Sequence, residues 1–134
     1  MLHESLQLQT PSHVLTYRYG TSTDSAIHAQ EVKVDQGDFC FKLAMNNQVI
    51  ADFRCGLPGH HNVQNALAAL GICYGFLGLP INELQQGIAT FKGAKRRFEY
   101  IHKSPTYVVI DDYAHHPEEL NAIIGSVRTL YPNK

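Results

Sequence analysis

Alternating apolar and polar residues in the part of the chain before residue 58 predict β-strands. We expect these strands over Val14–Tyr19, Ala29–Val34, Phe39–Ala44 and Val49–Arg54. Clusters of Gly, Asn and Asp separate the runs, which is typical of antiparallel strands with one solvated face. The last three runs follow one another closely and are expected to form a meander.

The apolar residues adopt a helical period after residue 58. They occur almost all round the segment from Asn62 to about Leu77, which predicts an interior helix. A Gly-Leu-Pro sequence ends that helix, and a second helix follows up to about residue 92. The buried face of the second helix is expected to contain Ile81, Leu84, Ile88 and Phe91.

Two further strands and a third helix are predicted in the remaining part of the chain. The strands cover Phe98–Ile101 and Tyr107–Ile110, and the uninterrupted apolar core of the second is typical of a parallel sheet. The helix begins after His116, because Pro117 suits the first helical position and the two glutamates that follow complement the helix dipole. Its buried face is expected to contain Leu120, Ile123, Ile124, Val127 and Leu130.

These elements indicate a mixed α/β fold, in which antiparallel strands are followed by buried helices and then by the start of a βαβ unit. The last helix runs into the C-terminus with no second strand after it. We therefore expect a truncated piece of a larger α/β protein, made of two partial domains that cover residues 1–93 and 94–134.

Composition and charge narrow the choice of partners. Hydrophobic residues make up 44% of the chain, and 11 basic side chains nearly balance 12 acidic ones, so no global field attracts nucleic acid or an anionic membrane. The longest apolar run, Ala66–Leu79, is too short to span a membrane, and no signal peptide is visible. The 3 cysteines lack the spacing of a disulfide or metal framework. We expect a cytoplasmic protein with neither a nucleic-acid nor a membrane partner.

Two polar clusters in the middle of the chain could carry chemistry. Asn62 and Asn65 are three positions apart at the start of a helix, so their amides share one face and can bind a planar heterocycle; alternatively, Asn62 caps the helix. Lys95, Arg96 and Arg97 form a basic loop. This loop can grip phosphate oxygens or can be a solvated turn.

A third cluster runs from Asp111 to Glu119. Adjacent carboxylates at the carboxyl end of an apolar strand lie where open α/β sheets bind ligands, and such a carboxylate can accept a hydrogen bond from a ribose hydroxyl. A purely structural turn is the alternative. The pairs His60-His61 and His115-His116 also allow a zinc site, but neighbouring residues seldom ligate one ion, so we predict no metal site.

In this order, the clusters resemble the motifs of the Mur ligase family. The motifs are GxHNxxNxxAA, GxxRRFE and DDYAHHPxEL, and the resemblance covers Leu57 to about Leu130. It implies that residues 1–93 are the latter part of a central ATP-binding domain and that residues 94–134 begin a Rossmann-like C-terminal domain. The DDYAHHP form is most similar to members that join L-alanine to UDP-N-acetylmuramate.

The resemblance also implies roles for individual residues. Asn62 and Asn65 would lie near the adenine of ATP, Arg97 would approach its phosphates, and Asp112 would hold its ribose. These four residues would clamp ATP between the two domains.

The chemistry implied by the resemblance is ATP-driven amide formation, in which Tyr113 and His115 face the incoming amino acid. The muramyl carboxylate attacks the γ-phosphate, and the amine of L-alanine attacks the acyl phosphate, with Mg²⁺ and cationic side chains neutralising charge. No GxxxxGK[ST] loop occurs in the 134 residues, and the family's magnesium ligands are also missing. We expect the isolated chain to have no ligase activity.

Two other functions stay open. A sister Mur ligase would add a preformed peptide to UDP-N-acetylmuramate, whereas a non-catalytic nucleotide-binding module would keep the fold without the chemistry. A half-finished sheet argues against the free-standing module, because an unpaired edge invites aggregation. We also expect Asn62, Arg97 and Asp112 to retain weak affinity for adenosine nucleotides.

Overall fold

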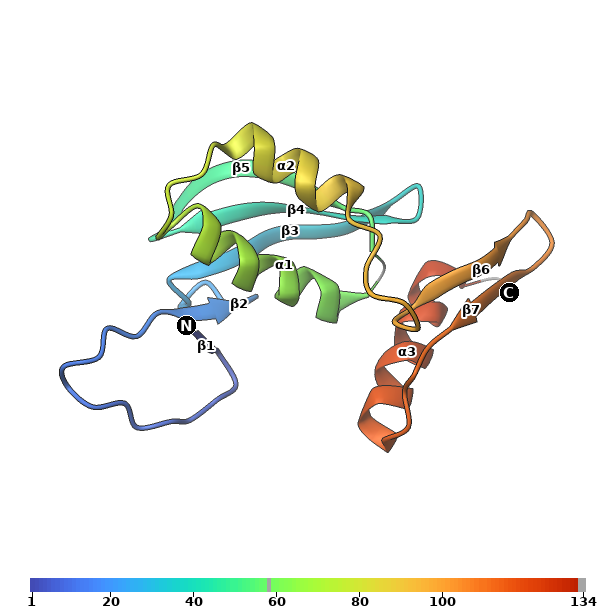
Figure 1. Ribbon diagram of the computed structural model, residues 1–134, viewed down its shortest axis with the longest axis horizontal. Helices are drawn as coiled ribbons and strands as arrows, with labels where there is room; N and C mark the ends of the chain where they lie inside the picture. The colour runs from blue at the N-terminus through green and yellow to red at the C-terminus, as the bar shows by residue number, and fades with distance from the viewer. Residues whose placement is uncertain (58, 133–134) are drawn as a thin grey trace.

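The computed structural model describes residues 1–57 and 59–132 of the chain, and its elements fall into two parts (Figure 1). In the first part, a five-stranded sheet in the order β1-β2-β3-β4-β5 carries two helices. The second part contains a two-stranded sheet and one helix. The elements are β1 (Leu2–His3), β2 (Arg18–Gly20), β3 (Ile27–Asp35), β4 (Asp38–Met45), β5 (Gln48–Cys55), α1 (His60–Cys73), α2 (Ile81–Thr90), β6 (Glu99–Lys103), β7 (Val108–Asp111) and α3 (Pro117–Leu130). The mixed α/β class is confirmed.

The meander predicted from the alternating pattern is also confirmed, because β3, β4 and β5 pair antiparallel in sequence order. Each connection is a two-residue turn in the left-handed region: Gln36 and Gly37 have φ of +52° and +90°, and Asn46 and Asn47 have +49° and +64°. Turns with two positive φ values match the twist of a hairpin, and Gly and Asn adopt such values most readily. Each hairpin then shifts its register by one residue at a bulge, between Gln30 and Lys33 in β3 and at Ile50 in β5. Beyond these bulges the alternate residues of both strands are buried, namely Ile27, Ala29, Phe53 and Cys55.

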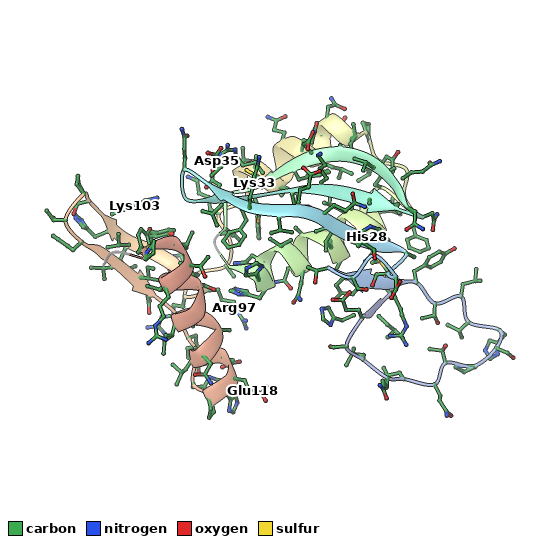
Figure 2. All side chains as sticks on the ribbon, turned by 180° about the vertical axis from the view of Figure 1, so that it is seen from behind. His28, Lys33, Asp35, Arg97, Lys103 and Glu118 are labelled. Atoms are coloured by element: carbon green, nitrogen blue, oxygen red, sulfur yellow. The ribbon has the colours of Figure 1, made fainter. Side chains whose placement is uncertain are left out.

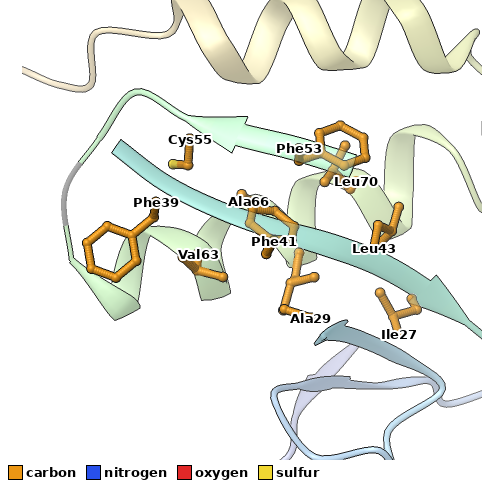
Figure 3. Packing of buried hydrophobic residues seen from close by; sticks show 11 residues of the cluster. Ile27, Ala29, Phe39, Phe41, Leu43, Phe53, Cys55, Val63, Ala66 and Leu70 are labelled. Carbon is orange, nitrogen blue, oxygen red and sulfur yellow. The ribbon is translucent and has the colours of Figure 1, made fainter. Parts of the chain in front are cut away.

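The hydrophobic core lies between that face and α1 (Figure 3). Leu43 of β4 and Val63 and Leu67 of α1 are fully buried members of one cluster, which also contains other apolar side chains of the three strands. The apolar side chains of α2 are partly buried against the same cluster, namely Ile81, Leu84 and Ile88. This packing holds α1, and with it the polar side chains of its first turns, against the sheet.

The strand predicted over Val14–Tyr19 is wrong for most of its length. Only the end of that run belongs to β2, which pairs parallel with both β1 and β3. Leu15 is 85% exposed, so the apolar residues of the run do not alternate onto the core. The carboxylate of Glu4 accepts the backbone N–H groups of Thr21 and Ser22, which ties β1 to the chain after β2.

Both helices of the first part are shorter than predicted. α1 ends at Cys73, not near Leu77, and Ile72 is exposed because only one side of the helix meets the sheet. The expectation of an interior helix is therefore wrong. α2 ends at Thr90, so Phe91 lies outside the helix and is exposed.

The second part corrects two further expectations. β7 pairs antiparallel with β6, not parallel with another strand. The start of α3 at Pro117 is confirmed, but its predicted buried face is right only in part: Ile123, Val127 and Leu130 are half-buried, whereas Leu120 and Ile124 are 45% and 47% exposed. The reason is that α3 contacts the first part near its C-terminal end, where Ser126 is buried and Leu130 packs against the core.

Within the described ranges, every helix is too short or too polar to cross a bilayer.

Candidate functional site

Asn62 and Asn65 lie in the first turns of α1 and share one face, as predicted. The side-chain amide of Asn65 donates to Oδ1 of Asn62 over 3.4 Å. The alternative in which Asn62 caps the helix is wrong, because Gly59 holds the N-cap position and its carbonyl accepts the Asn62 N–H at 3.0 Å. Gly59 has a φ of +102°, which residues with a side chain rarely adopt, so a glycine is needed where the chain turns into α1.

Arg97 lies in a loop whose backbone is tied to the end of β7. Oδ2 of Asp112 accepts the Phe98 N–H at 2.7 Å, and Oδ1 accepts the Ala114 N–H at 2.8 Å. Phe98 is 1% exposed and has a φ of +51°, a left-handed conformation that costs energy in a bulky residue. The buried ring and the Asp112 carboxylate therefore hold this loop in one shape.

A pocket of about 250 Å³ opens between α1 and this loop. Its lining includes all of the site residues that the sequence predicts: Asn62, Asn65, Arg97, Asp112, Tyr113 and His115. Figure 2 shows Arg97 in the space between α1 and α3. The neighbouring cations Lys95 and Arg96 are exposed and lie outside the lining, so Arg97 is the basic-loop residue that faces the pocket.

Charges of both signs face this pocket. Burial lowers the pKa of His61, the Arg97 guanidinium lowers it further, and the Asp112 carboxylate acts in the opposite direction. Backbone N–H groups, that of His115 among them, donate to the carboxylate of Glu119 and lower its pKa. The pocket at neutral pH therefore combines a guanidinium with carboxylates, a mixture that can bind both a phosphate and a hydroxyl group.

Tyr113 and His115 form an aromatic pair at the mouth of the pocket. Their ring centroids are 5.3 Å apart in an edge-on arrangement. Nδ1 of His115 donates to the Tyr113 carbonyl at 3.1 Å, because a carbonyl oxygen can only accept. Both residues are exposed, so their rings are accessible to a second ligand beside the one that Arg97 and Asp112 would bind.

A second pocket of about 300 Å³ adjoins the first and was not predicted from the sequence. Asn62 and Asn65 belong to the lining of both pockets. The other lining residues are apolar or small. They come from β5, α1, α2 and the chain directly after β5 and α2, and they include Cys55, Leu57, Ala66, Ile88 and Phe91. Burial raises the pKa of the Cys55 thiol, which keeps it neutral. An apolar pocket beside two amides suits a planar heterocycle.

Nowhere in the described ranges do three His, Cys, Asp or Glu side chains come together in a way that could hold a metal ion. His60 and His61 point to different places: the His60 ring contacts Phe39 with a centroid distance of 5.1 Å, whereas His61 lines the pocket.

Comparison with known proteins supports a relationship along both parts of the chain. Residues 2–73 match the family described as Mur ligase middle domain, and residues 96–134 match the one described as Mur ligase, glutamate ligase domain. The chain is 43% identical over 115 residues to the UDP-N-acetylmuramate--L-alanine ligase of Flavobacterium psychrophilum, covering 86% of this chain and 25% of that protein. It is 34% identical over 131 residues to the enzyme of the same name from Aquifex aeolicus, covering 96% and 28%.

Solved structures show the same fold. The UDP-N-acetylmuramate-alanine ligase of Thermotoga maritima has a TM-score of 0.79 at 24% identity, over 88% of this chain and 27% of that one. The UDP-N-acetylmuramoylalanyl-D-glutamyl-2,6-diaminopimelate--D-alanyl-D-alanyl ligase of Acinetobacter baumannii has a TM-score of 0.70 at 26% identity, over 84% and 24%. The chain thus spans about a quarter of the length of the relatives that it matches.

Proposed function

Because the chain belongs to the Mur ligase family, we propose that its two adjoining pockets form part of the ATP site of a ligase that joins L-alanine to UDP-N-acetylmuramate. One observation carries the proposal: residues from α1, the basic loop and the end of β7 line a single pocket. These are the residues to which the family resemblance gives a role at ATP. Curated relatives at up to 43% identity carry the name of this ligase, which favours L-alanine over a preformed peptide as the second substrate.

The two pockets differ in a way that matches the parts of a nucleotide. The apolar pocket would take the adenine, with the amides of Asn62 and Asn65 at the wall that it shares with the polar pocket. Arg97 would neutralise phosphate charge in the polar pocket. Asp112 would bind the ribose, because each carboxylate oxygen keeps a lone pair after accepting one backbone N–H.

Tyr113 and His115 would face the second substrate, since both are exposed at the mouth of the same pocket. In this arrangement residues 1–93 supply the adenine side of the site, as the latter part of the central ATP-binding domain. Residues 94–134 supply the phosphate and amino-acid side, as the beginning of the C-terminal domain.

The proposed reaction needs charge neutralisation and positioning more than covalent help from the protein. The carboxylate of UDP-N-acetylmuramate attacks the γ-phosphate of ATP, which forms an acyl phosphate and releases ADP. The amine of L-alanine then attacks the acyl carbon, forms the amide bond, and releases phosphate and a proton. Arg97, which lines the polar pocket, would offset the negative charge on the transferred group.

Magnesium, which ligases of this kind use, does not fit the described residues, because they bring together no set of three His, Cys, Asp or Glu ligands. The 134 residues also contain no GxxxxGK[ST] loop to cradle the phosphates. We therefore place both functions outside this sequence. The chain incubated with ATP, UDP-N-acetylmuramate and L-alanine should form no amide above background, and detectable product would contradict this assignment.

Titration of the chain with ADP, followed by amide chemical shifts, tests the proposed site. Shifts should concentrate on residues around both pockets, with weak affinity because the phosphate loop is missing. Arg97→Ala should weaken binding, whereas Lys95→Ala, which removes a cation of the same loop outside the pocket, should leave it unchanged. Absence of shifts at millimolar ADP, or equal effects of the two variants, would refute the site.

A further inference from the structure

The two sides of the proposed nucleotide site meet where the chain enters α1 and α3 passes beside it. We propose that Gly59 and Ser126 form a close contact that positions α3, and with it the Arg97 side of the pocket, against Asn62 and Asn65. This inference rests on the proposed function for its ligand, but the contact itself is a property of the apo chain. Gly59 acts as a positioning residue, since it touches neither pocket itself.

The geometry at Gly59 leaves no room for a side chain. A Cβ atom built there would lie 2.8 Å from Oγ of Ser126 and 2.7 Å from Cε1 of His61. Both distances are shorter than any ordinary carbon contact, so both side chains, or the backbone at residue 59, would have to move. Gly59 is buried, and its φ of +102° excludes most other residues independently.

Ser126 is fixed on its own side of the contact. Among the α3 side chains, all of which the structure describes, only that of Ser126 belongs to a buried residue, with 7% exposure. Its hydroxyl donates to the Ala122 carbonyl at 2.8 Å, as serines on buried helix faces commonly do. A small side chain at this point lets the helix approach the backbone of Gly59 closely.

A side chain at Gly59 would change the pocket whichever neighbour gives way. His61 lines the pocket, so displacement of its ring alters the wall directly. Displacement of α3 moves Ala122 and Ile123, which also line the pocket. The Gly59–Ser126 contact therefore sets the width of the site that Arg97 and Asn62 share.

The chain offers a matched control for the substitution Gly59→Ala. Gly78 also has a positive φ, of +66°, but a Cβ there meets nothing within 4 Å. Gly78→Ala therefore introduces the backbone strain of a left-handed alanine without the contact with His61 and Ser126. The φ of Gly59 is +102° against +66° at Gly78, so this control matches only part of the backbone strain. Ser126→Val, which leaves every residue of positive φ unchanged, separates the contact from the strain.

Two readouts separate this inference from the proposed function. Nuclear Overhauser effects between the His61 ring and the Ser126 side chain report the contact without any ligand, and ADP titration reports its consequence. Gly59→Ala should weaken these effects and raise the Kd for ADP roughly tenfold, whereas Gly78→Ala should change neither. If the wild-type chain binds no ADP, the proposed function fails, and the Overhauser effects alone decide the contact.

A second variant tests the same contact from α3, in case Gly59→Ala does not fold. Ser126→Val enlarges the buried side chain without changing a left-handed residue, and should weaken ADP binding as Gly59→Ala does. Gly125→Ala is its control, because a Cβ at Gly125 meets nothing within 4 Å. Wild-type affinity and an unchanged His61 environment in Ser126→Val, or equal losses in both α3 variants, would overturn the inference.

Discussion

Asp112→Asn tests whether the basic loop is held by the two hydrogen bonds that its carboxylate accepts. An asparagine keeps one oxygen acceptor but turns the other atom into an N–H donor, which then faces a backbone N–H. The Phe98 and Ala114 amides lie 2.7 Å and 2.8 Å from the carboxylate oxygens, so one of these bonds must be lost.

The expected magnitude follows from the burial of the groups. A hydrogen bond to a charged acceptor contributes about 1.5–3 kcal/mol, and a buried donor left unsatisfied costs about 1–3 kcal/mol. Phe98 is almost completely buried, whereas Asp112 is only half-buried, which reduces the charge effect. We therefore expect Asp112→Asn to lower the free energy of unfolding of this part by about 2 kcal/mol.

Urea denaturation followed by far-ultraviolet circular dichroism measures this change, since the chain has no tryptophan to report by fluorescence. Hydrogen exchange of the Phe98 amide gives the local free energy at the loop. Glu99→Gln is the matched control: Oε2 of Glu99 accepts the Arg96 N–H at 2.9 Å, but this bond is exposed and should contribute less than about 1 kcal/mol. If Asp112→Asn destabilises no more than Glu99→Gln, the proposed anchoring of the loop is wrong.

Three further predictions concern stability, thiol reactivity and pH. Leu67→Ala, at a fully buried position of α1, should lower the free energy of unfolding by about 2.5–5 kcal/mol in urea, whereas exposed Leu8→Ala should have almost no effect. Cys55 is buried, so its thiol should react with Ellman's reagent far more slowly than that of the half-buried Cys40 in the folded chain, and at a similar rate in urea. Backbone N–H groups lower the pKa of Glu119 below 4.5, so its contribution to stability should be complete above pH 4.5 and be lost as the pH falls through the folded-state value. Glu119→Gln should remove that part of the acid dependence, and an unchanged pH profile of urea midpoints would contradict the assignment.

Local sequence signals predicted the meander well because its turns are decided by a few residues. Asn46 and Asn47 adopt positive φ at low cost, and the flanking alternation then sorts side chains between the two faces. The run at Val14 has the same alternation but no turn of this kind beside it. Its environment depends on the parallel pairing of β1 with β2, which no local pattern encodes.

Some residues of the candidate site could likewise be recognised from local sequence signals, whereas others could not. Asn62, Arg97 and Asp112 stand out because polar residues at the start of a helix, in a loop and at a strand end are typical of ligand sites. Cys55 and Ile88 of the apolar pocket look like ordinary core residues in the sequence. Only the arrangement of β5, α1 and α2 reveals that a cavity lies between them.

Residues of the proposed site come from both parts of the structure, so substitutions in the two parts should affect nucleotide binding and folding differently. Asn62 and Asn65 stand on α1, which the core holds through Val63 and Leu67. Arg97 stands on a loop that depends on the Asp112 carboxylate and on the buried ring of Phe98. Loss of core packing therefore unfolds the first part and removes the adenine side of the site with it. Loss of the loop contacts, or of the contact with α3, instead displaces Arg97 while the five-stranded sheet persists. Nucleotide affinity should consequently fall before the sheet unfolds whenever the second part is perturbed, because ligand binding needs residues of both parts, whereas Leu130 is the one described residue of the second part in the core cluster or packed against it.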